Sequence, residues 1–251
     1  VIVGFGLQDV AEKTIFEYAD IKGEALAVPV SNINPYLVDA PDLVLEKRNQ
    51  PICIVPTISY GSMANDDGHL LLDKEQRNAL IAAEPATAPY IRRYMGAQEF
   101  LNNAERWCLW LKDISPSLMR SSNELRHRIE AVRKFRASSN REATRNLAAT
   151  PSLFGEDRQP LKSYLLLPKV SSENRPYMPI GFMPSEVIAN GSALTISDSG
   201  HYEMGVLQSK MHMAWMRAVA GRMKSDYQYS AQIVYNNFPW PDLPEKLEPN
   251  Q

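Results

Sequence analysis

Apolar and polar positions alternate along this chain in two ways, with a helical spacing in some segments and a strand spacing in others. The clearest helical pattern covers residues 121–138 and begins with a capping box formed by Ser121 and Glu124. Its apolar stripe consists of Leu125, Ile129, Val132 and Phe135. Two more helices are expected over residues 73–83 and 85–94. A last helical pattern starts at Glu203, with an apolar face made of Met204, Leu207, Met211, Ala214 and Ala218.

Short apolar runs bounded by turn residues predict the strands. Thr14–Tyr18 and Ala25–Val28 flank a turn at Asp20–Gly23 and have the form of a hairpin. The other strands are expected over residues 1–5, 52–60, 107–111, 164–167, 177–182 and 193–196. Polar loops at residues 61–68 and 169–176 separate some of them. This mixed order of elements predicts an α+β fold with a mixed, mainly antiparallel sheet and surrounding helices.

The composition is that of a folded protein that spans no membrane. A chain of 251 residues with 44% hydrophobic and 22% charged residues can bury a substantial core, in one large domain or two smaller ones. No run of about 18 apolar residues and no secretory signal occurs, so we expect a soluble, intracellular protein. Cys53 and Cys108 lie inside apolar runs, which predicts buried thiols in a reducing compartment and no disulfide or zinc framework.

The charge balance restricts where nucleic acid could bind. A formal net charge of -2 differs from the basic balance of most dedicated DNA-binding domains. Any DNA-binding surface must therefore be a local patch. The chain also begins without Met and directly in an apolar strand, so we expect it to be a fragment of a longer protein.

Three short patterns resemble catalytic motifs, and a structural interpretation is favoured for all three. Gly4 and Gly6 follow the first strand as in a nucleotide-binding loop, but the third glycine of that fingerprint is replaced by Asp9. Asn34-Pro35-Tyr36 is one proline short of the Asn-Pro-Pro-Tyr loop of amino-methylating DNA methyltransferases. It also lies too close to Gly4 for a methyl-donor domain, so a turn is expected.

The third pattern resembles a compressed nuclease metal site. It consists of Asp42, Glu46 and Lys47, residue types that can hold a divalent cation and orient water. Its spacing leaves no room for a hairpin between the carboxylates, which favours a solvated edge strand. The four histidines show no metal-ligand spacing. We therefore expect no catalytic residue, metal site or cofactor site in this chain.

Longer runs of the sequence resemble a single family. They are 33–42, 60–63, 65–72, 90–96, 99–102, 106–111, 126–136, 171–177, 179–182, 211–217, 229–230 and 235–241. In this order they are similar to the target recognition region of MmeI-like enzymes, bacterial proteins that fuse an adenine-specific DNA methyltransferase to restriction activity. The resemblance covers nearly the whole chain.

The resemblance implies recognition without chemistry. Residues 1–12 would end a preceding methyltransferase domain, 13–235 would form the target recognition domain with a basic helical segment near 116–148, and 236–251 would be a Pro-rich exit strap. The parent would be a cytoplasmic bacterial enzyme that methylates adenine N6 with S-adenosylmethionine. The implied partners of this chain are double-stranded DNA and the upstream methyltransferase domain, and no membrane.

A recognition domain contacts phosphates through Arg and Lys and reads base edges through polar side chains. The phosphate candidates on the 121–138 helix are Arg126, Arg128, Arg133 and Arg136. A solvated face partly neutralised by Glu124 and Glu130 is an equally open interpretation. The other phosphate candidates are Arg92, Arg93, Lys210, Arg217 and Arg222.

Two polar loops hold the candidates for contact with bases or with the DNA backbone. In the first they are Lys169, Ser172, Glu173, Asn174 and Arg175, and in the second they are Asn65, Asp67 and His69. Simple turns remain the alternative at both loops.

The tryptophans and the C-terminal strap are expected to have structural roles. The tryptophans at 107, 110, 215 and 240 are expected in the core, and the helix from Glu203 with the strap at 238–241 is expected to close the fold rather than read bases. Two other functions stay open. One is a stand-alone metal-dependent nuclease that uses Asp42, Glu46 and Lys47, and the other is a protein-interaction domain without DNA contact, which the acidic net charge favours.

Overall fold

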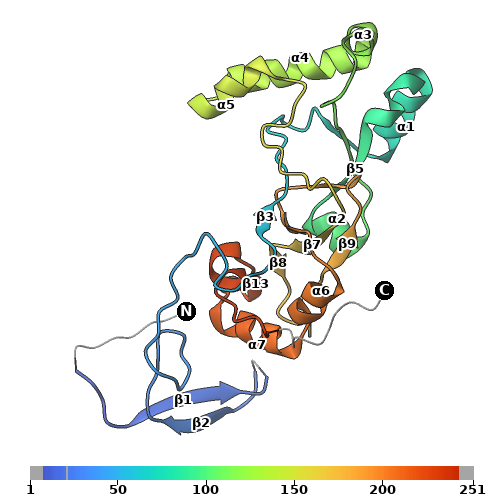
Figure 1. Cartoon of the computed structure of the whole chain (residues 1–251). Helices are drawn as coiled ribbons and strands as arrows, with labels where there is room; N and C mark the ends of the chain where they lie inside the picture. The colour runs from blue at the N-terminus through green and yellow to red at the C-terminus, as the bar shows by residue number, and fades with distance from the viewer. Residues whose placement is uncertain (1–7, 21, 243–251) are drawn as a thin grey trace. The chain divides into compact units, whose positions relative to one another are not determined.

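A computed structural model describes residues 8–20 and 22–242 of the chain (Figure 1). The chain divides into two compact units, the first ending at Lys47 and the second beginning at Arg48. The strand and glycine pair predicted at residues 1–6 lie outside the described residues. The domain boundary predicted after residue 12 stays a prediction.

The first unit contains one hairpin, as predicted. Strands β1 (Lys13–Tyr18) and β2 (Ala25–Val30) pair antiparallel, with Lys13 opposite Val30, and Gly23 N–H closes the turn by donating to Asp20 O at 2.8 Å. The Asn34 side chain accepts hydrogen bonds from the backbone of Tyr36 and Val38, at 2.9 and 3.3 Å. Asn34 therefore forms the turn that was expected there.

The second unit contains helices and short strands from Ile58 onward. The helices are α1 (Lys74–Ala83), η1 (Pro85–Tyr90), α2 (Ala97–Asn102), α3 (Pro116–Ser121), α4 (Asn123–Ala137), α5 (Glu142–Asn146), η2 (Leu147–Ala149), α6 (His201–Leu207), α7 (Lys210–Val219) and the π-helical turn η3 (Ala231–Tyr235). The strands are β3 (Ile58–Tyr60), β4 (Leu71–Leu72), β5 (Ile91–Met95), β6 (Trp107–Leu109), β7 (Tyr164–Pro168), β8 (Val170–Ser171), β9 (Gly181–Met183), β10 (Ile188–Ala189), β11 (Ala193–Ser197), β12 (Gly221–Met223) and β13 (Asp226–Gln228).

These strands form three small sheets with the orders β10-β5-β6-β4, β3-β11-β7-β9 and β12-β13-β8. Within the described residues every pairing of these strands is antiparallel except that of β10 with β5. The predicted α+β class with mainly antiparallel pairing is confirmed.

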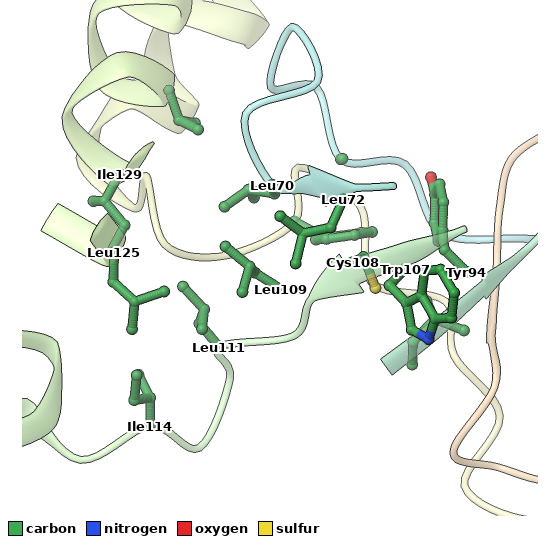
Figure 2. Packing of buried hydrophobic residues seen from close by; sticks show 14 of the residues in the cluster. Leu70, Leu72, Tyr94, Trp107, Cys108, Leu109, Leu111, Ile114, Leu125 and Ile129 are labelled. Carbon is green, nitrogen blue, oxygen red and sulfur yellow. The ribbon is translucent and has the colours of Figure 1, made fainter. Parts of the chain in front are cut away.

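The first core of the second unit lies between the β5-β6-β4 strands and helix α4. Figure 2 shows Leu125 and Ile129 of the helix on one side and Leu109 and Leu111 of the β6 segment on the other. Trp107 and Cys108 belong to the same core, as predicted. Burial of these large apolar side chains is the main force that attaches α4 to the sheet.

The second core lies between the sheet of β3, β11 and β7 and the elements α6, α7 and η3. Phe238 and Trp240 of the Pro-rich strap are buried in it, and Trp215 donates its indole N–H to Val234 O at 2.9 Å. The predicted role of the strap in closing the fold is therefore confirmed. Cys53 is only partly buried at the edge of this core, so its thiol is less buried than predicted.

Three predicted helices differ from the observed ones. The helix expected over 85–94 is wrong beyond Tyr90, because the short 3-10 helix that contains Pro89 ends there and Ile91–Met95 pairs with β6 instead. The capping box at Ser121 is also wrong. Ser121 ends α3, and Ser122 caps α4 by accepting a hydrogen bond from Leu125 N–H at 3.0 Å.

The helix that starts near Glu203 is two helices rather than one. Ser209 accepts a hydrogen bond from His212 N–H at 3.1 Å and begins α7 anew. The predicted apolar face is wrong from that point, since Met211, Ala214 and Ala218 are exposed and His212, Met213 and Met216 are buried. The strand predicted over 177–182 is reduced to β9, and β8 lies inside the loop predicted at 169–176.

Candidate nucleic-acid interface

A three-stranded sheet carries the turn between β8 and β9. In β13, Tyr227 pairs with Ser171 and Gln228 with Val170, and Tyr229 N–H donates to Lys169 O at 2.7 Å. These backbone bonds hold the chain rigidly up to Ser171. The turn that follows is therefore mounted on a fixed scaffold.

The turn itself presents polar side chains outward. Arg175 N–H donates to Ser172 O at 3.1 Å, and Asn174 N–H donates to the Ser172 hydroxyl at 3.3 Å. Glu173 and Asn174 are exposed at its tip, whereas Arg175 is half-buried. Within the part of the chain that the structure describes, the buried Nε of Arg175 has no hydrogen-bond partner. A buried donor without a partner costs free energy.

The same small sheet brings Arg222 to this turn. Arg222 in β12 pairs with Tyr227 in β13, which pairs in turn with Ser171. The Arg222 guanidinium lies 3.9 Å from the centroid of the Tyr227 ring and donates to Ser225 O at 3.0 Å. Candidates that are far apart in sequence, Lys169, Ser172–Arg175 and Arg222, thus share one sheet.

Two further residues join Lys169, and the sequence analysis missed both. The ammonium of Lys169 lies 4.3 Å from the centroid of the Tyr60 ring, and the guanidinium of Arg158 lies 5.9 Å from it. Arg158 also forms an ion pair with Glu156. Burial lowers the pKa of Lys169, and the nearby positive charge of Arg158 lowers it further. Tyr60 is far from Arg158 and Lys169 in sequence, so only the fold reveals this cluster.

The Asn65 loop is built around a buried arginine. Asn65, Asp67 and Gly68 have positive φ angles of 50°, 54° and 83°, which makes the loop sharp. Arg136 is fully buried beside it and donates to the carbonyl oxygens of Ala64 and Asn65, at 2.8 and 2.9 Å. Its other N–H groups donate to the carbonyls of Leu147, Thr150 and Leu153.

All five guanidinium donors of Arg136 are therefore used inside the protein. The prediction that Arg136 contacts phosphate is wrong for this reason. Arg128 is similarly engaged, since it donates to His69 O at 2.9 Å and to Glu124 at 2.7 Å with its side chain 15% exposed. Arg128 and Arg136 therefore support the Asn65 loop rather than face solvent.

The other arginines of α4 are exposed. Arg126 donates to the Asn123 side chain at 2.5 Å, and Arg133 pairs with Glu130 at 3.3 Å. These contacts are weak and break readily in water. The basic face predicted for this helix is thus smaller than the sequence indicated.

The remaining candidates are separate from both loops. Arg93 stacks on Trp107 at 5.4 Å and lies 3.7 Å from Glu105, and Arg92 is half-buried with an Nε that no described residue accepts from. Lys210 and Arg217 are exposed on α7. Next to Asn65 lies a cavity of about 360 Å³, whose polar lining includes Arg106, Asn190 and Ser192.

The structure also bears on the metal-dependent nuclease alternative and on membrane spans. Among residues 8–20 and 22–242, no three His, Cys, Asp or Glu side chains are grouped as ligands of a metal ion, and Asp42 accepts a hydrogen bond from the Asn32 amide at 2.9 Å. No described helix has both the length and the apolar character needed to cross a bilayer.

Comparison with known proteins identifies close relatives. A family model described as "MmeI, target recognition domain" matches residues 39–242. DNA methyltransferase A of Bacillus subtilis (strain 168) is 37% identical over 243 residues, which cover 97% of this chain and 27% of that protein. The solved structure of the type IIL restriction-modification enzyme MmeI in complex with DNA superimposes with a TM-score of 0.89 at 45% identity, over 96% of this chain and 32% of that one. The chain therefore spans about a third or less of these relatives.

Proposed function

This chain belongs to the family of MmeI target recognition domains, and from that premise we propose that it selects the DNA sequence on which a larger restriction-modification methyltransferase acts. One observation carries the proposal. An enzyme solved in complex with DNA matches 96% of this chain in fold, at 45% sequence identity. The TM-score of 0.89 shows that the two backbones share one fold.

The turn at Ser172–Arg175 is the proposed base-reading element. Arginine can donate two hydrogen bonds to guanine, asparagine can pair with adenine, and a carboxylate can accept from cytosine, all in the major groove. Glu173, Asn174 and Arg175 supply these three chemistries next to one another on a rigid sheet. Asn65, Asp67 and His69 form a second proposed reading loop, which Arg128 and Arg136 support from beneath.

Phosphate contacts would come from the other cations of the chain. The proposed residues are the exposed or half-buried cations Arg92, Arg93, Arg126, Arg133, Lys169, Lys210, Arg217 and Arg222. Such contacts supply affinity and register without reading the sequence. A local patch of this kind is compatible with a net charge of -2.

The chemistry would belong to the rest of the parent protein. We propose that the parent methylates adenine N6 with S-adenosylmethionine in the bacterial cytoplasm, through a methyltransferase domain upstream of this chain. The bacterial DNA methyltransferase that resembles the chain over 27% of its own length supports this assignment. This chain would supply neither cofactor binding nor catalysis.

Arg175→Ala in the full-length parent tests the base-reading role. We expect the set of methylated adenines in cellular DNA to change at one position of the recognised sequence, because discrimination by one bidentate pair, about 1–3 kcal/mol, is lost. The measurement is sequencing that detects N6-methyladenine. Arg133→Ala, which removes an exposed arginine far from the turn in sequence, serves as the control and should leave the methylated sequence unchanged.

The alternative without DNA contact is distinguished by titration. The 251-residue chain should bind duplex DNA at low salt, with an affinity that falls steeply as salt rises. Absence of binding at low salt would contradict the proposed function and favour a protein-interaction domain.

A further inference from the structure

The Tyr60 ring holds two cations in place beside the proposed reading turn. Lys169 lies 4.3 Å from the ring centroid and Arg158 lies 5.9 Å from it. The backbone of both cations is fixed, since Lys169 N–H donates to Ser192 O at 3.1 Å and Arg158 N–H donates to the Ser62 hydroxyl at 3.0 Å. The cluster is therefore preorganised and does not depend on flexible surface side chains alone.

The charges of this cluster are not balanced. Glu156 pairs with Arg158, but no carboxylate of the described residues lies within ion-pair distance of the Lys169 ammonium. Lys169 is also half-buried, and a second positive charge is near. Partial desolvation and repulsion between like charges both cost free energy, and an anion that bonds to the ammonium would remove this cost.

The position of the ammonium selects an anion rather than a base. A nucleic-acid base binds tyrosine by stacking on the face of the ring, and Lys169 lies over that face. A phosphate oxygen, in contrast, can bond to the ammonium and the guanidinium together. Lys169 also comes directly before β8, so an anion held there would lie close to the start of the reading turn.

We propose that Tyr60, Arg158 and Lys169 form a phosphate-binding site that anchors the backbone of duplex DNA beside the Ser172–Arg175 turn. The inference rests on the proposed function and extends it to Tyr60 and Arg158. The two cations bond to the phosphate, and Tyr60 positions them without bonding to it. The site contributes affinity and register rather than sequence preference.

The test measures binding of a fluorescent duplex of arbitrary sequence to the 251-residue chain at several salt concentrations. Lys169→Gln should weaken binding roughly five- to tenfold near 0.1 M salt and reduce the slope of log affinity against log salt by about one. Arg158→Gln should act in the same direction. Tyr60→Leu should weaken binding because the cations lose their support, whereas Tyr60→Phe should bind normally.

Lys162→Gln is the matched control. It removes the same charge from the segment between Arg158 and Lys169, but within the described residues its ammonium makes no cation–ring contact with Tyr60, is highly exposed, and lies 3.7 Å from Asp198. Its affinity should change less than about twofold, as expected for a weak surface pair. Lys169→Arg keeps the charge and should restore most of the binding. Thermal melting of each variant checks that it is folded.

If the unmodified chain binds DNA with steep salt dependence but Lys169→Gln behaves as Lys162→Gln does, the phosphate site is wrong and the proposed function stands. If Lys169→Gln changes the preferred sequence but not the salt slope, the site reads bases and the inference is overturned. If it abolishes binding of inorganic phosphate while DNA binding is normal, the site serves free phosphate and the inference is again overturned. An unmodified chain that binds no DNA contradicts the proposed function itself.

Discussion

Arg136 is a charged residue at a buried position, so hydrophobic periodicity did not predict its structural role. The buried positions of α4 are Leu125, Ile129, Val132 and Arg136. They follow the helical repeat without a break, but a charged residue at the last position directed the predicted stripe to Phe135, which is 37% exposed. Sequence patterns register residue type, and they do not reveal five carbonyl oxygens that converge on one guanidinium.

Arg136→Met should destabilise the protein by about 3–5 kcal/mol. The substitution leaves one buried and four partly buried carbonyls without their donor, and breaking such a network by removing one partner is strongly destabilising. The measurement is urea unfolding followed by circular dichroism. Arg133→Met, on an exposed face of the same helix, should change stability by less than about 0.5 kcal/mol. A similar midpoint for the two variants would show that the buried network contributes little.

At the level of elements, the helix expected over 73–83 matches α1, and periodicity predicted the extent of α4 because Leu125, Ile129 and Val132 share one buried face. It failed at α6 and α7, where Ser209 restarts the helix and so changes which residues face the core. Gln208, Ser209 and Lys210 interrupt the apolar residues at that point, but three polar residues in a row also fit the solvent-facing side of one continuous helix. The Tyr60 and Arg158 cluster was missed for a different reason, because antiparallel pairing of distant strands decides which loops meet.

Helix α7 is joined to the segment after β13 by a buried histidine, and this makes the attachment sensitive to pH. His212 Nε2 lies 2.9 Å from the Tyr229 hydroxyl, and the ring meets Phe238 edge-on at 4.5 Å. Burial lowers the pKa of His212 from 6.5 to about 4. The unfolded chain therefore takes up a proton between these two values that the folded chain excludes.

Stability should consequently fall as the pH decreases from 6.5 toward 4, by up to about 3 kcal/mol from this residue. His212→Gln keeps a polar partner for Tyr229 but cannot titrate, so its unfolding free energy should depend less on pH over the same range. His127→Gln alters an exposed histidine and should retain the full dependence. Chemical unfolding at a series of pH values measures the difference. Equal slopes for the chain with and without His212 would assign the pH dependence to other groups.

For the whole molecule, the boundary between the two compact units has a structural explanation. The hairpin of the first unit exposes Phe16, Tyr18 and Leu26 at 59%, 58% and 64%, so within its own unit it has little core. In sequence these residues look like ordinary core strands, which is why no boundary was predicted at Lys47. The segment after Lys47 differs, because Ile52 N–H donates to Asn236 O at 2.9 Å.

Because the hairpin has little core and the segment after Lys47 is bonded into the second unit, we expect the chain to tolerate removal of residues 1–47. A variant beginning at Arg48 should melt cooperatively within a few degrees of the full chain, because both large cores consist of residues from Cys53 onward. A variant beginning at Thr57 should be clearly less stable. It loses the Pro56 carbonyl that accepts from the buried Tyr235 hydroxyl, and the Arg48 carbonyl that accepts from Asn236 at 2.7 Å. Calorimetry of the two variants makes the comparison.

If the Arg48 variant fails to fold while the full chain folds, the first unit contributes to the core. If it folds and binds DNA with an unchanged salt slope, every proposed contact lies within the second unit, where all the candidate residues are.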